Sequence, residues 1–374
     1  MTKSRSRVTR PRHAARRDRA AARRDQVATI KEVAAQAGVS IATVSRAFAD
    51  PDAVSADLRA RVQEAADLLQ YRPSRAARTL RSGTSRAVGV VIPDLQNPFF
   101  TEVVRGVDSV LQMAGYTLLL ANADEDADRE REILATFRAE GVAGIIFVPI
   151  NAGKNTYGEL LAPPVHTVAV DRLPSHLRVD LVTVNNKEGT RLGVAHLIGR
   201  GHREVALLSG PSKHSTAVER ERGYEEALRA AGLPLRSEFV YRGDFREGGG
   251  YEGVKALMAL PRPPSAIFVA NNLMTLGALR ALHEIGRRIP DDVALVGFDD
   301  MPWATSLNPP LTAIAQPAQE IGSSAAELLL DRIARPDRTL RHVILETRLV
   351  IRASCGRRPE RKQTAGAQSA RPGS

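Results

Sequence analysis

The polar side chains that could do chemistry in this chain follow short apolar runs, at the points where strands are expected to end. Asp171 follows "VHTVAV", Asn271 follows "AIFVA" and Asp299 follows "VALVGF". Carboxylates and amides hydrogen-bond to hydroxyl groups, a guanidinium forks onto neighbouring oxygens, and aromatic rings stack on a sugar or base ring. These residue types indicate a site for a small polar ligand. Its ten candidate residues are Phe99, Phe100, Asp171, Arg172, His214, Thr216, Arg220, Phe245, Asn271 and Asp299.

Each candidate has an alternative role as a helix cap or a loop hydrogen bond. That alternative is as strong as ligand binding for Thr216 and weaker for Asp299. The set is more persuasive than any member, because every expected strand end contributes at least one residue.

The sequence lacks the patterns of a catalytic or metal site. Residues 210–216 place a lysine after an expected strand, but a phosphate-binding loop needs a second glycine and a serine or threonine directly after the lysine. The eight histidines show no two-ligand helical spacing with an acid, and Cys355 is the only thiol. No nucleophile-elbow pattern is present. We therefore expect no enzyme activity, no metal and no cofactor.

Alternating strands and helices must position the ligand-site candidates. The runs "AVGVVIP", "YTLLLAN", "GIIFVP" and "VHTVAVD" form one set, and "EVALLSG", "EFVYRGD", "AIFVAN" and "VALVGFD" form a second. This rhythm predicts two α/β halves with parallel sheets, whose ligands bind in a cleft beyond the carboxyl ends of the strands. Helical patterns separate the strands near residues 99–114, 129–139, 186–199, 218–231, 248–259 and 273–284.

A pair of short helices near the N-terminus has the pattern of a DNA-reading module. Thr29 and Glu32 form a capping box that starts the first helix, Gly38 ends it, and Ser40 can cap a second helix. The outer face of this second helix presents Arg46, the best candidate for a bidentate contact to guanine or phosphate. A third helix completes a small core. The candidate DNA-contacting residues here are Thr29, Ser40, Ile41, Ala42, Thr43, Ser45, Arg46 and Ser55.

A short basic segment at residues 74–83, "SRAARTLRSG", follows the third helix. It has helical propensity but too few apolar residues for a core, so we interpret it as a hinge helix. It argues against the alternative that the preceding helices belong to an enzyme. Here the chain resembles the lactose/galactose repressor (LacI-GalR) family, through "TIKEVAAQAGVSIATVSRAF", "YRPSRAARTLRSG" and "VGFDD", over roughly residues 27 to 355.

The resemblance implies a role for the hinge in DNA binding. Leu80 would wedge between base pairs from the minor groove, with Ala77 against the groove beside it. The alternative for Leu80 is packing against the core. The hinge residues expected to contact DNA are Arg75, Ala77 and Leu80.

The resemblance also implies a mechanism: a repressor that binds a near-palindromic operator as a homodimer, with a helix near residues 99–114 at the dimer surface. An effector, with a sugar favoured, would change the angle between the halves and move the hinge. The positions that match sugar-responsive members are Asp171, Arg220, Asn271 and Asp299. Those that match the purine-responsive branch are Phe99, His214, Thr216 and Phe245.

Two positions depart from the family pattern. His214 stands where the purine branch carries arginine, and Asn272 where many relatives carry aspartate. These departures weaken a purine assignment.

The distribution of charge and the length of the apolar stretches indicate which partners and which cellular location to expect. The net charge is +11, but residues 1–26 hold ten basic and two acidic side chains, and residues 356–374 hold five and one, which leaves −1 for the remainder. The tails supply attraction to phosphate, or are simply solvated extensions.

No apolar stretch reaches membrane-spanning length and no apolar signal core follows the arginine-rich start, so we expect a cytoplasmic protein without disulfides. The rival, a periplasmic-type sugar-binding protein, would not need residues 29–81.

The expected fold is an all-α helix-turn-helix headpiece plus an α/β core like the periplasmic binding proteins, with two doubly wound parallel-sheet subdomains. We expect a disordered basic arm at 1–26, the headpiece at 27–73, the hinge helix and linker at 74–84, the effector-binding and dimerisation core at 85–355, and a disordered basic tail at 356–374. Within the core, the first subdomain is expected at roughly 85–185 plus 317–345, and the second at roughly 186–316 plus 346–355.

Overall fold

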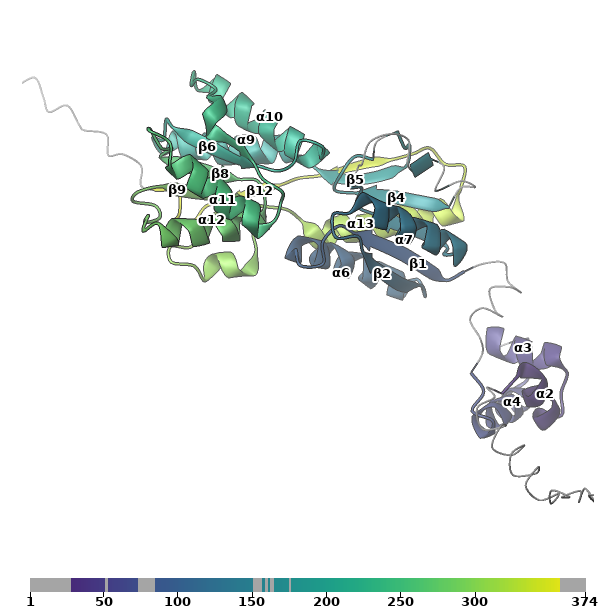
Figure 1. Cartoon of the computed structure of the whole chain (residues 1–374). Helices are drawn as coiled ribbons and strands as arrows, with labels where there is room; N and C mark the ends of the chain where they lie inside the picture. The colour runs from purple at the N-terminus through teal and green to yellow at the C-terminus, as the bar shows by residue number, and fades with distance from the viewer. Residues whose placement is uncertain are drawn as a thin grey trace, which may run out of the picture. The chain divides into compact units, whose positions relative to one another are not determined.

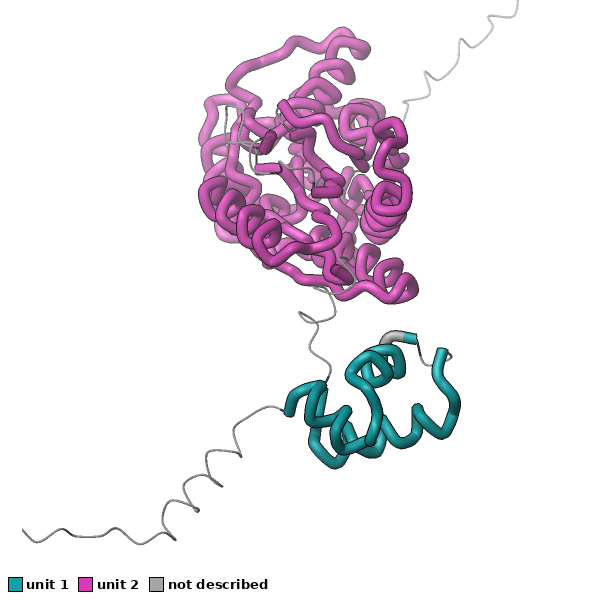
Figure 2. Tube along the Cα trace, turned by 90° about the vertical axis from the view of Figure 1, so that its right-hand side faces the viewer, with its two compact units in different colours: residues 1–84 teal, residues 85–374 magenta. Residues whose placement is uncertain are grey.

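The computed structural model divides the chain into two compact units, residues 1–84 and residues 85–374 (Figure 2). The hinge residues Arg75, Ala77 and Leu80 lie outside the described part of the chain, as do the N-terminal arm and the C-terminal tail. The described residues are 28–50, 53–72, 85–150, 157–158, 161, 165–174 and 176–356.

Unit 1 is a three-helix domain built from α2 (Ile30–Ala37), α3 (Ile41–Ala49) and α4 (Ala56–Leu68). Val33, Val44 and Val62, one from each helix, are at most 1% exposed and form its centre with several alanines. Small side chains let the helices approach closely, so eight buried residues suffice for a core. Gly38 ends α2 in the left-handed conformation at φ 64°, which turns the chain into α3.

Unit 2 begins with a subdomain whose six-stranded sheet has the order β11-β5-β4-β3-β1-β2. All its strand pairs are parallel. Helices α6 (Pro98–Met113) and α13 (Ala318–Ala334) share a core cluster with one face, and α7 (Ala127–Ala139) shares a cluster with the other. The strands are β1 (Ala87–Ile92), β2 (Thr117–Asn122), β3 (Gly144–Phe147), β4 (His166–Val170), β5 (Asp180–Val184) and β11 (His342–Leu345).

The second subdomain of unit 2 repeats this arrangement with the strand order β12-β10-β9-β8-β6-β7. Its pairs are parallel except for the edge strand β12, which runs antiparallel to β10. The helices are α9 (Asn186–Gly199), α10 (Ser215–Ala230), α11 (Glu247–Met258) and α12 (Asn272–Glu284). The strands are β6 (Val205–Ser209), β7 (Val240–Arg242), β8 (Ala266–Val269), β9 (Ala294–Phe298), β10 (Thr312–Ala315) and β12 (Arg348–Val350). Short 3₁₀ helices lie at Ser237–Phe239 and Pro302–Thr305.

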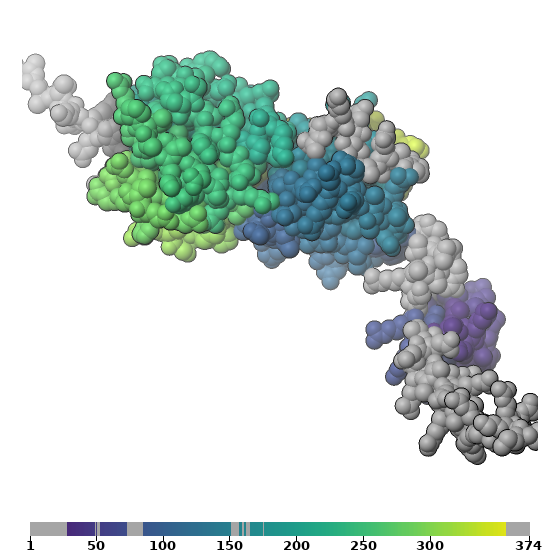
Figure 3. Space-filling model, viewed as in Figure 1, coloured from purple at the N-terminus to yellow at the C-terminus, as the bar shows by residue number. Residues whose placement is uncertain are grey.

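The chain crosses between the two subdomains three times: between β5 and α9, between β10 and α13, and between β11 and β12. Figure 1 shows these crossing segments between the two lobes, and Figure 3 shows the lobes in contact on one face. Two crossings are bonded to each other, because the Thr347 N–H donates to Asn185 Oδ1 at 2.8 Å and the Asn185 amide donates to Glu346. Two of the three linkers are therefore connected directly to each other.

Helix pairs in unit 2 approach each other through glycines. A Cβ atom added at Gly322 of α13 would lie 2.0 Å from the carbonyl oxygen of Val103 in α6, and one at Gly106 of α6 would lie 2.0 Å from that of Gln319. Both distances are far inside van der Waals contact, so any side chain there would force the two helices apart.

We expect Gly322→Ala to destabilise unit 2, by about 1–3 kcal/mol for overpacking. The control is Gly199→Ala at the end of α9, where an added Cβ meets nothing within 4 Å. It should be neutral or stabilising by up to about 1 kcal/mol, because alanine favours helix. Chemical denaturation of both variants measures the difference. Equal stability of the two would contradict the close α6–α13 contact.

Candidate functional site

The outer face of α3 in unit 1 carries the residues predicted to read DNA. Arg46 and Ala42 are exposed, and Ile41 is 44% exposed, whereas Val44 on the opposite face is fully buried. Ile41 lies in the first turn of this capped helix and Arg46 in its last turn. Exposed apolar and basic side chains on such a helix are typical of a recognition surface.

Three predicted DNA-contacting residues are helix N-caps. The Ser40 hydroxyl accepts a hydrogen bond from the Thr43 N–H at 3.0 Å, and Ser55 Oγ accepts one from the Leu58 N–H at 3.4 Å. At α2, the Glu32 carboxylate accepts from the Thr29 N–H at 2.8 Å. These side chains fix the starts of the helices, whose free N–H groups can also receive phosphate.

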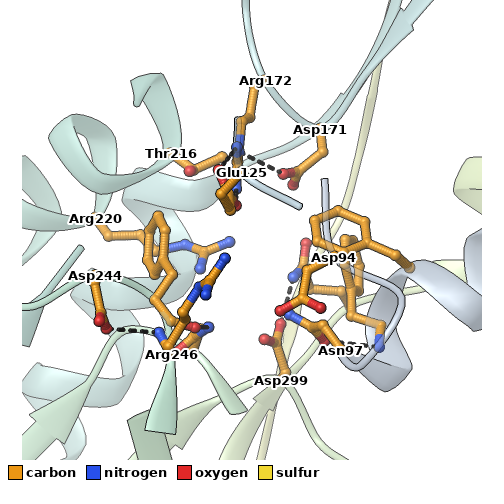
Figure 4. Close-up of a pocket in the computed structure, with 15 residues that line it drawn as sticks. Asp94, Asn97, Glu125, Asp171, Arg172, Thr216, Arg220, Asp244, Arg246 and Asp299 are labelled. Carbon is orange, nitrogen blue, oxygen red and sulfur yellow. Dashed lines mark hydrogen bonds and ion pairs between the residues drawn. The ribbon is translucent and has the colours of Figure 1, made fainter. Parts of the chain in front are cut away.

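The ligand-site candidates come together around a cleft between the two subdomains of unit 2 (Figure 4). All the candidates line the cavity except His214. The lining residues are Asp94, Asn97, Phe99, Phe100, Glu125, Asp171, Arg172, Thr216, Arg220, Asp244, Phe245, Arg246, Asn271, Asp299 and Gln316.

His214 lies behind the cavity wall rather than on it. It is 1% exposed, its ring centroid is 5.9 Å from that of Phe245, and its Nε2 is 3.6 Å from the Glu125 carboxylate. Burial, followed by the positive charges of Arg172 and Lys213, lowers its pKa to about 2. The imidazole is therefore neutral and supports Phe245 from behind.

Six lining residues are not among the ten candidates: Asp94, Asn97, Glu125, Asp244, Arg246 and Gln316. Each lies in the segment that follows a strand, so the rule that selected Asp171 and Asp299 also covers them. They were missed because the rule was applied only to the most conspicuous side chains after each run.

The first-subdomain wall is built around a buried ion pair. Arg172 donates from Nη1 and Nη2 to the two Glu125 carboxylate oxygens at 3.0 and 2.7 Å. Burial opposes the charge on Arg172, but the Glu125 carboxylate outweighs it and raises the pKa of Arg172. Asp171, whose carboxylate is 3.7 Å from Arg172 Nε, has its pKa raised to about 6 by burial. Arg172 is thus occupied by protein carboxylates.

The second-subdomain wall is built around Arg220. Its Nε donates to Asn186 Oδ1 at 2.8 Å, its Nη1 donates to the Ala270 carbonyl, and its guanidinium carbon lies 3.7 Å from the centroid of Phe298. Burial lowers the pKa of Arg220. Figure 4 shows the guanidinium directed into the cavity, so its free edge is available to a ligand.

Asp299 accepts hydrogen bonds from two residues of this wall. The Asn272 N–H donates to Oδ2 at 3.2 Å and the Gln316 amide donates to Oδ1. Burial raises the pKa of Asp299. Gln316 lies in the β10–α13 crossing, which connects the ligand site directly to a linker.

Backbone strain is concentrated at this cavity. Asp171, Phe245 and Asp299 adopt left-handed conformations at φ 65°, 65° and 76°, and Asp124 and Glu125 do so at 55° and 56°. Non-glycine residues with such conformations cost roughly 1–3 kcal/mol each and occur often at functional sites. The strain aims these side chains into the cleft immediately after their strands.

Direct hydrogen bonds between the subdomains hold the cleft closed. The Leu173 N–H donates to Ser215 Oγ at 2.9 Å, and Asn272 Nδ2 donates to Asn97 Oδ1 at 2.9 Å. Asn97 Oδ1 also accepts from the Phe99 N–H, so the Asn272 amide uses its second lone pair. An ionised aspartate at position 272 could not donate this hydrogen bond.

Several buried polar atoms near the cavity have no hydrogen-bond partner in the part of the chain that the structure describes. They are Arg172 Nε, His214 Nδ1, Asn272 Oδ1 and Gln316 Oε1. Such atoms are costly to bury unsatisfied, and a polar ligand would satisfy those that it reaches.

Other classes of site are not seen in the described residues. Among them, no three histidine, cysteine, aspartate or glutamate side chains are placed to hold a metal ion. None of their helices combines the length and the apolar character needed to cross a bilayer.

A DNA-reading helix pair joined to a two-lobed ligand-binding core defines a transcription regulator. The family description "Bacterial regulatory proteins, lacI family" matches residues 29–74, and "Periplasmic binding protein-like domain" matches residues 194–355. The chain is 34% identical over 310 residues to the ribose operon repressor of Escherichia coli strain K12, covering 82% of this chain and 94% of that protein. The chain therefore belongs to the lacI family of bacterial regulatory proteins, and it is a DNA-binding transcription regulator.

Solved structures show the same fold. A lac repressor dimer bound to operator and the anti-inducer ONPF is 28% identical with a TM-score of 0.78, covering 88% of this chain and 99% of that one. A complex of the transcriptional regulator CelR with cellobiose is 32% identical with a TM-score of 0.67, covering 87% and 99%. The predicted fold class is confirmed.

A buried acid behind the cavity predicts a pH effect on stability. Glu130 is 3% exposed, accepts from the Tyr157 hydroxyl at 2.7 Å and the Ile150 N–H at 3.1 Å, and has its pKa raised by burial to about 7. Because its folded pKa exceeds its unfolded pKa, its contribution to stability is present at low pH and is lost as the pH rises from about 4.5 to 7.

The Glu130→Gln variant should therefore gain stability relative to the unmodified protein across that pH window and level off above it. The amide keeps the shape without the charge: its oxygen can accept from the Ile150 N–H, and its NH2 group can donate to the Tyr157 hydroxyl oxygen. Thermal melts of both proteins at a series of pH values measure the difference. A constant difference in melting temperature from about pH 4.5 to 8 would show that Glu130 does not titrate there.

Proposed function

We propose that this protein is a repressor that binds a near-palindromic operator as a homodimer and responds to a neutral sugar bound between the subdomains of unit 2. The similar lac repressor is a dimer on its operator, and the similar CelR binds cellobiose. The observation that carries the proposal is the cleft between the subdomains, which is lined by buried polar side chains and aromatic rings. The protein would act in the cytoplasm, where its DNA lies.

The charge of the cavity favours a neutral ligand over an anionic one. Five carboxylates line it against three arginines, and two of those arginines already bind protein acids. A phosphate group would meet this excess of negative charge without a free cationic pair to receive it. Sugar hydroxyl groups, by contrast, can donate to Asp171 and Asp299, accept from Arg220, and place the C–H face of the ring on Phe99 or Phe245.

Ligand binding would reach DNA through the linkers. Asp299 is bonded to Gln316 in one crossing, and the other two crossings are bonded through Asn185 and Thr347. A ligand that binds the closed cleft better than the open one changes the equilibrium between the two angles of the subdomains. In a dimer this change would move the two hinge segments relative to each other.

A thermal-shift screen tests the ligand class. Neutral sugars and their phosphate esters are compared as matched pairs, for example ribose with ribose 5-phosphate and glucose with glucose 6-phosphate. A neutral sugar that binds should raise the melting temperature, since it binds only the folded protein, and its ester should not. A larger shift from an ester than from its parent sugar would contradict the neutral-ligand proposal.

Asp299→Asn should weaken that sugar by about 10- to 100-fold, because a hydrogen bond to a charged acceptor is worth roughly 1.5–3 kcal/mol. Asparagine tolerates the left-handed backbone at this position, so the fold is kept. The exposed Asp291→Asn is the matched control and should bind normally. Calorimetric titration measures affinity, and operator binding without ligand should be unchanged in both variants. Normal sugar affinity in Asp299→Asn would remove Asp299 from the site.

Arg46→Ala should weaken specific operator binding by about 1–3 kcal/mol and relax discrimination at one base position. The operator is first selected from random-sequence DNA with the unmodified protein. Fluorescence anisotropy then compares operator with scrambled DNA of the same length. Because Arg46 is exposed, the melting temperature should not change. An undiminished ratio of operator to scrambled affinity would reject α3 as the recognition helix.

A further inference from the structure

The first-subdomain sheet is electrically polarised along its strands. All six strands are parallel, so the segments that precede them lie at one edge and the segments that follow them lie at the cleft. Among the described residues, the preceding segments carry five arginines and two acids: Arg86, Arg178, Arg335, Arg338 and Arg341 against Glu140 and Asp337. The following segments carry one arginine and six acids: Arg172 against Asp94, Asp124, Glu125, Asp126, Asp171 and Glu346.

This basic edge stands out from the rest of the core. Residues 85–356 contain 30 basic and 33 acidic side chains, so the core is slightly acidic as a whole. A local excess of arginine in an acidic domain is not explained by composition. The segregation gives one edge an attraction for anions that the remainder of the core does not have.

The arginines at this edge are anchored by buried acids. Asp180, at the start of β5, is fully buried and accepts from Arg332 Nε at 2.9 Å and from Arg338 at 2.8 and 3.0 Å. Burial opposes ionisation of Asp180, but these hydrogen bonds outweigh it and lower its pKa. Arg332 and Arg338 therefore have a structural role and hold the loop before β11 in place.

Three other arginines are left for a partner. Arg335 and Arg341 have side chains 66% and 53% exposed, and both share the single carboxylate of Asp331 with Arg338. One carboxylate cannot accept hydrogen bonds from all the N–H groups of three guanidinium groups. Most of the N–H donors of Arg335 and Arg341 therefore face water. Arg178 is also exposed, directly before β5. This set, Arg178, Arg335 and Arg341, is termed the basic edge patch.

The covalent path to the DNA-reading unit leaves from the same edge. Ser85 lies two residues before the start of β1, and residues 73–84 connect it to Arg72, the last described residue of unit 1. Twelve residues can span at most roughly 45 Å when fully extended. Unit 1 is therefore attached to the chain at this basic edge, whereas the acidic segments lie at the opposite end of the same strands.

We propose that the basic edge patch binds the phosphate backbone of DNA flanking the operator. Guanidinium forks match the geometry of phosphate oxygens, and arginines held by neighbouring side chains lose little freedom on binding. The interaction adds affinity that depends on salt and on DNA length but not on sequence. This inference rests on the operator binding proposed above and assigns the core a direct interaction with DNA.

The test uses the full-length triple variant Arg178→Gln, Arg335→Gln, Arg341→Gln. Its matched control, Arg229→Gln, Arg262→Gln, Arg287→Gln, removes the same charge from exposed positions of the second subdomain. Each protein is titrated onto two duplexes: the selected operator alone, and the same operator extended by one helical turn at each end. Affinities are measured over a series of salt concentrations.

We expect the unmodified protein and the control to bind the extended duplex more tightly than the short one, with a steeper salt dependence. The basic-edge variant should not show this increase, which is about tenfold at low salt. Its slope of log affinity against log salt should be shallower by roughly 0.9 for each phosphate that it no longer neutralises. On the short duplex it should match the unmodified protein.

Equal weakening on both duplexes, or none on either, would overturn the proposal, as would an equal weakening in the control. If the unmodified protein selects no sequence from random DNA, the proposed operator binding fails, and this inference fails with it. Melting temperatures of both triple variants, expected within a few degrees of the unmodified protein, show whether any weakening arises from misfolding.

Discussion

The parallel direction of the strands is the constraint on which unit 2 depends. In a parallel sheet every strand ends at the same edge, so residues far apart in the sequence meet there without any long-range pairing of their own. Asp171 and Asp299 are brought to one cavity in this way, from sheets in different subdomains. The same constraint collects the segments before the strands at the opposite edge. One topology therefore creates both a ligand cleft and a second, chemically distinct surface.

The charged groups that are buried in this cleft need hydrogen-bonding partners. Arg172 and Arg220 are each about as buried as core leucines, and each is held by carboxylate, amide or carbonyl oxygens. Removing a charged group from water costs several kcal/mol, which only such partners offset. Of these two cations, Arg172 is occupied by carboxylates and Arg220 keeps one free edge, so the site offers mainly acceptors and aromatic faces and disfavours anions. The left-handed backbone of Asp171, Phe245 and Asp299 adds a further cost in conformational energy.

Local rules predicted much of this from the sequence, and long-range contacts account for the rest. The capping of α2 and α3 involves residues three apart, so Thr29, Glu32 and Ser40 identified the helix starts correctly. The strand-end rule found the cavity wall but could not separate His214, which lies behind it, because depth depends on packing against Phe245. The sequence runs did not pick out β5, β10, α13, β11 or β12. The four strands are short and carry little periodicity.

The three crossings explain how a cleft closed by weak bonds can control a distant event. Each hydrogen bond between the subdomains contributes only a small net free energy, because its donor and acceptor can bond to water instead. Thr347 and Asn185 bond two of the crossings to each other, and Gln316 in the third is bonded to Asp299 in the ligand site. A ligand that contacts Asp299 therefore acts on a residue that is bonded directly to a crossing. A difference of a few kcal/mol in affinity between the open and closed states is then sufficient to shift the population of the whole core.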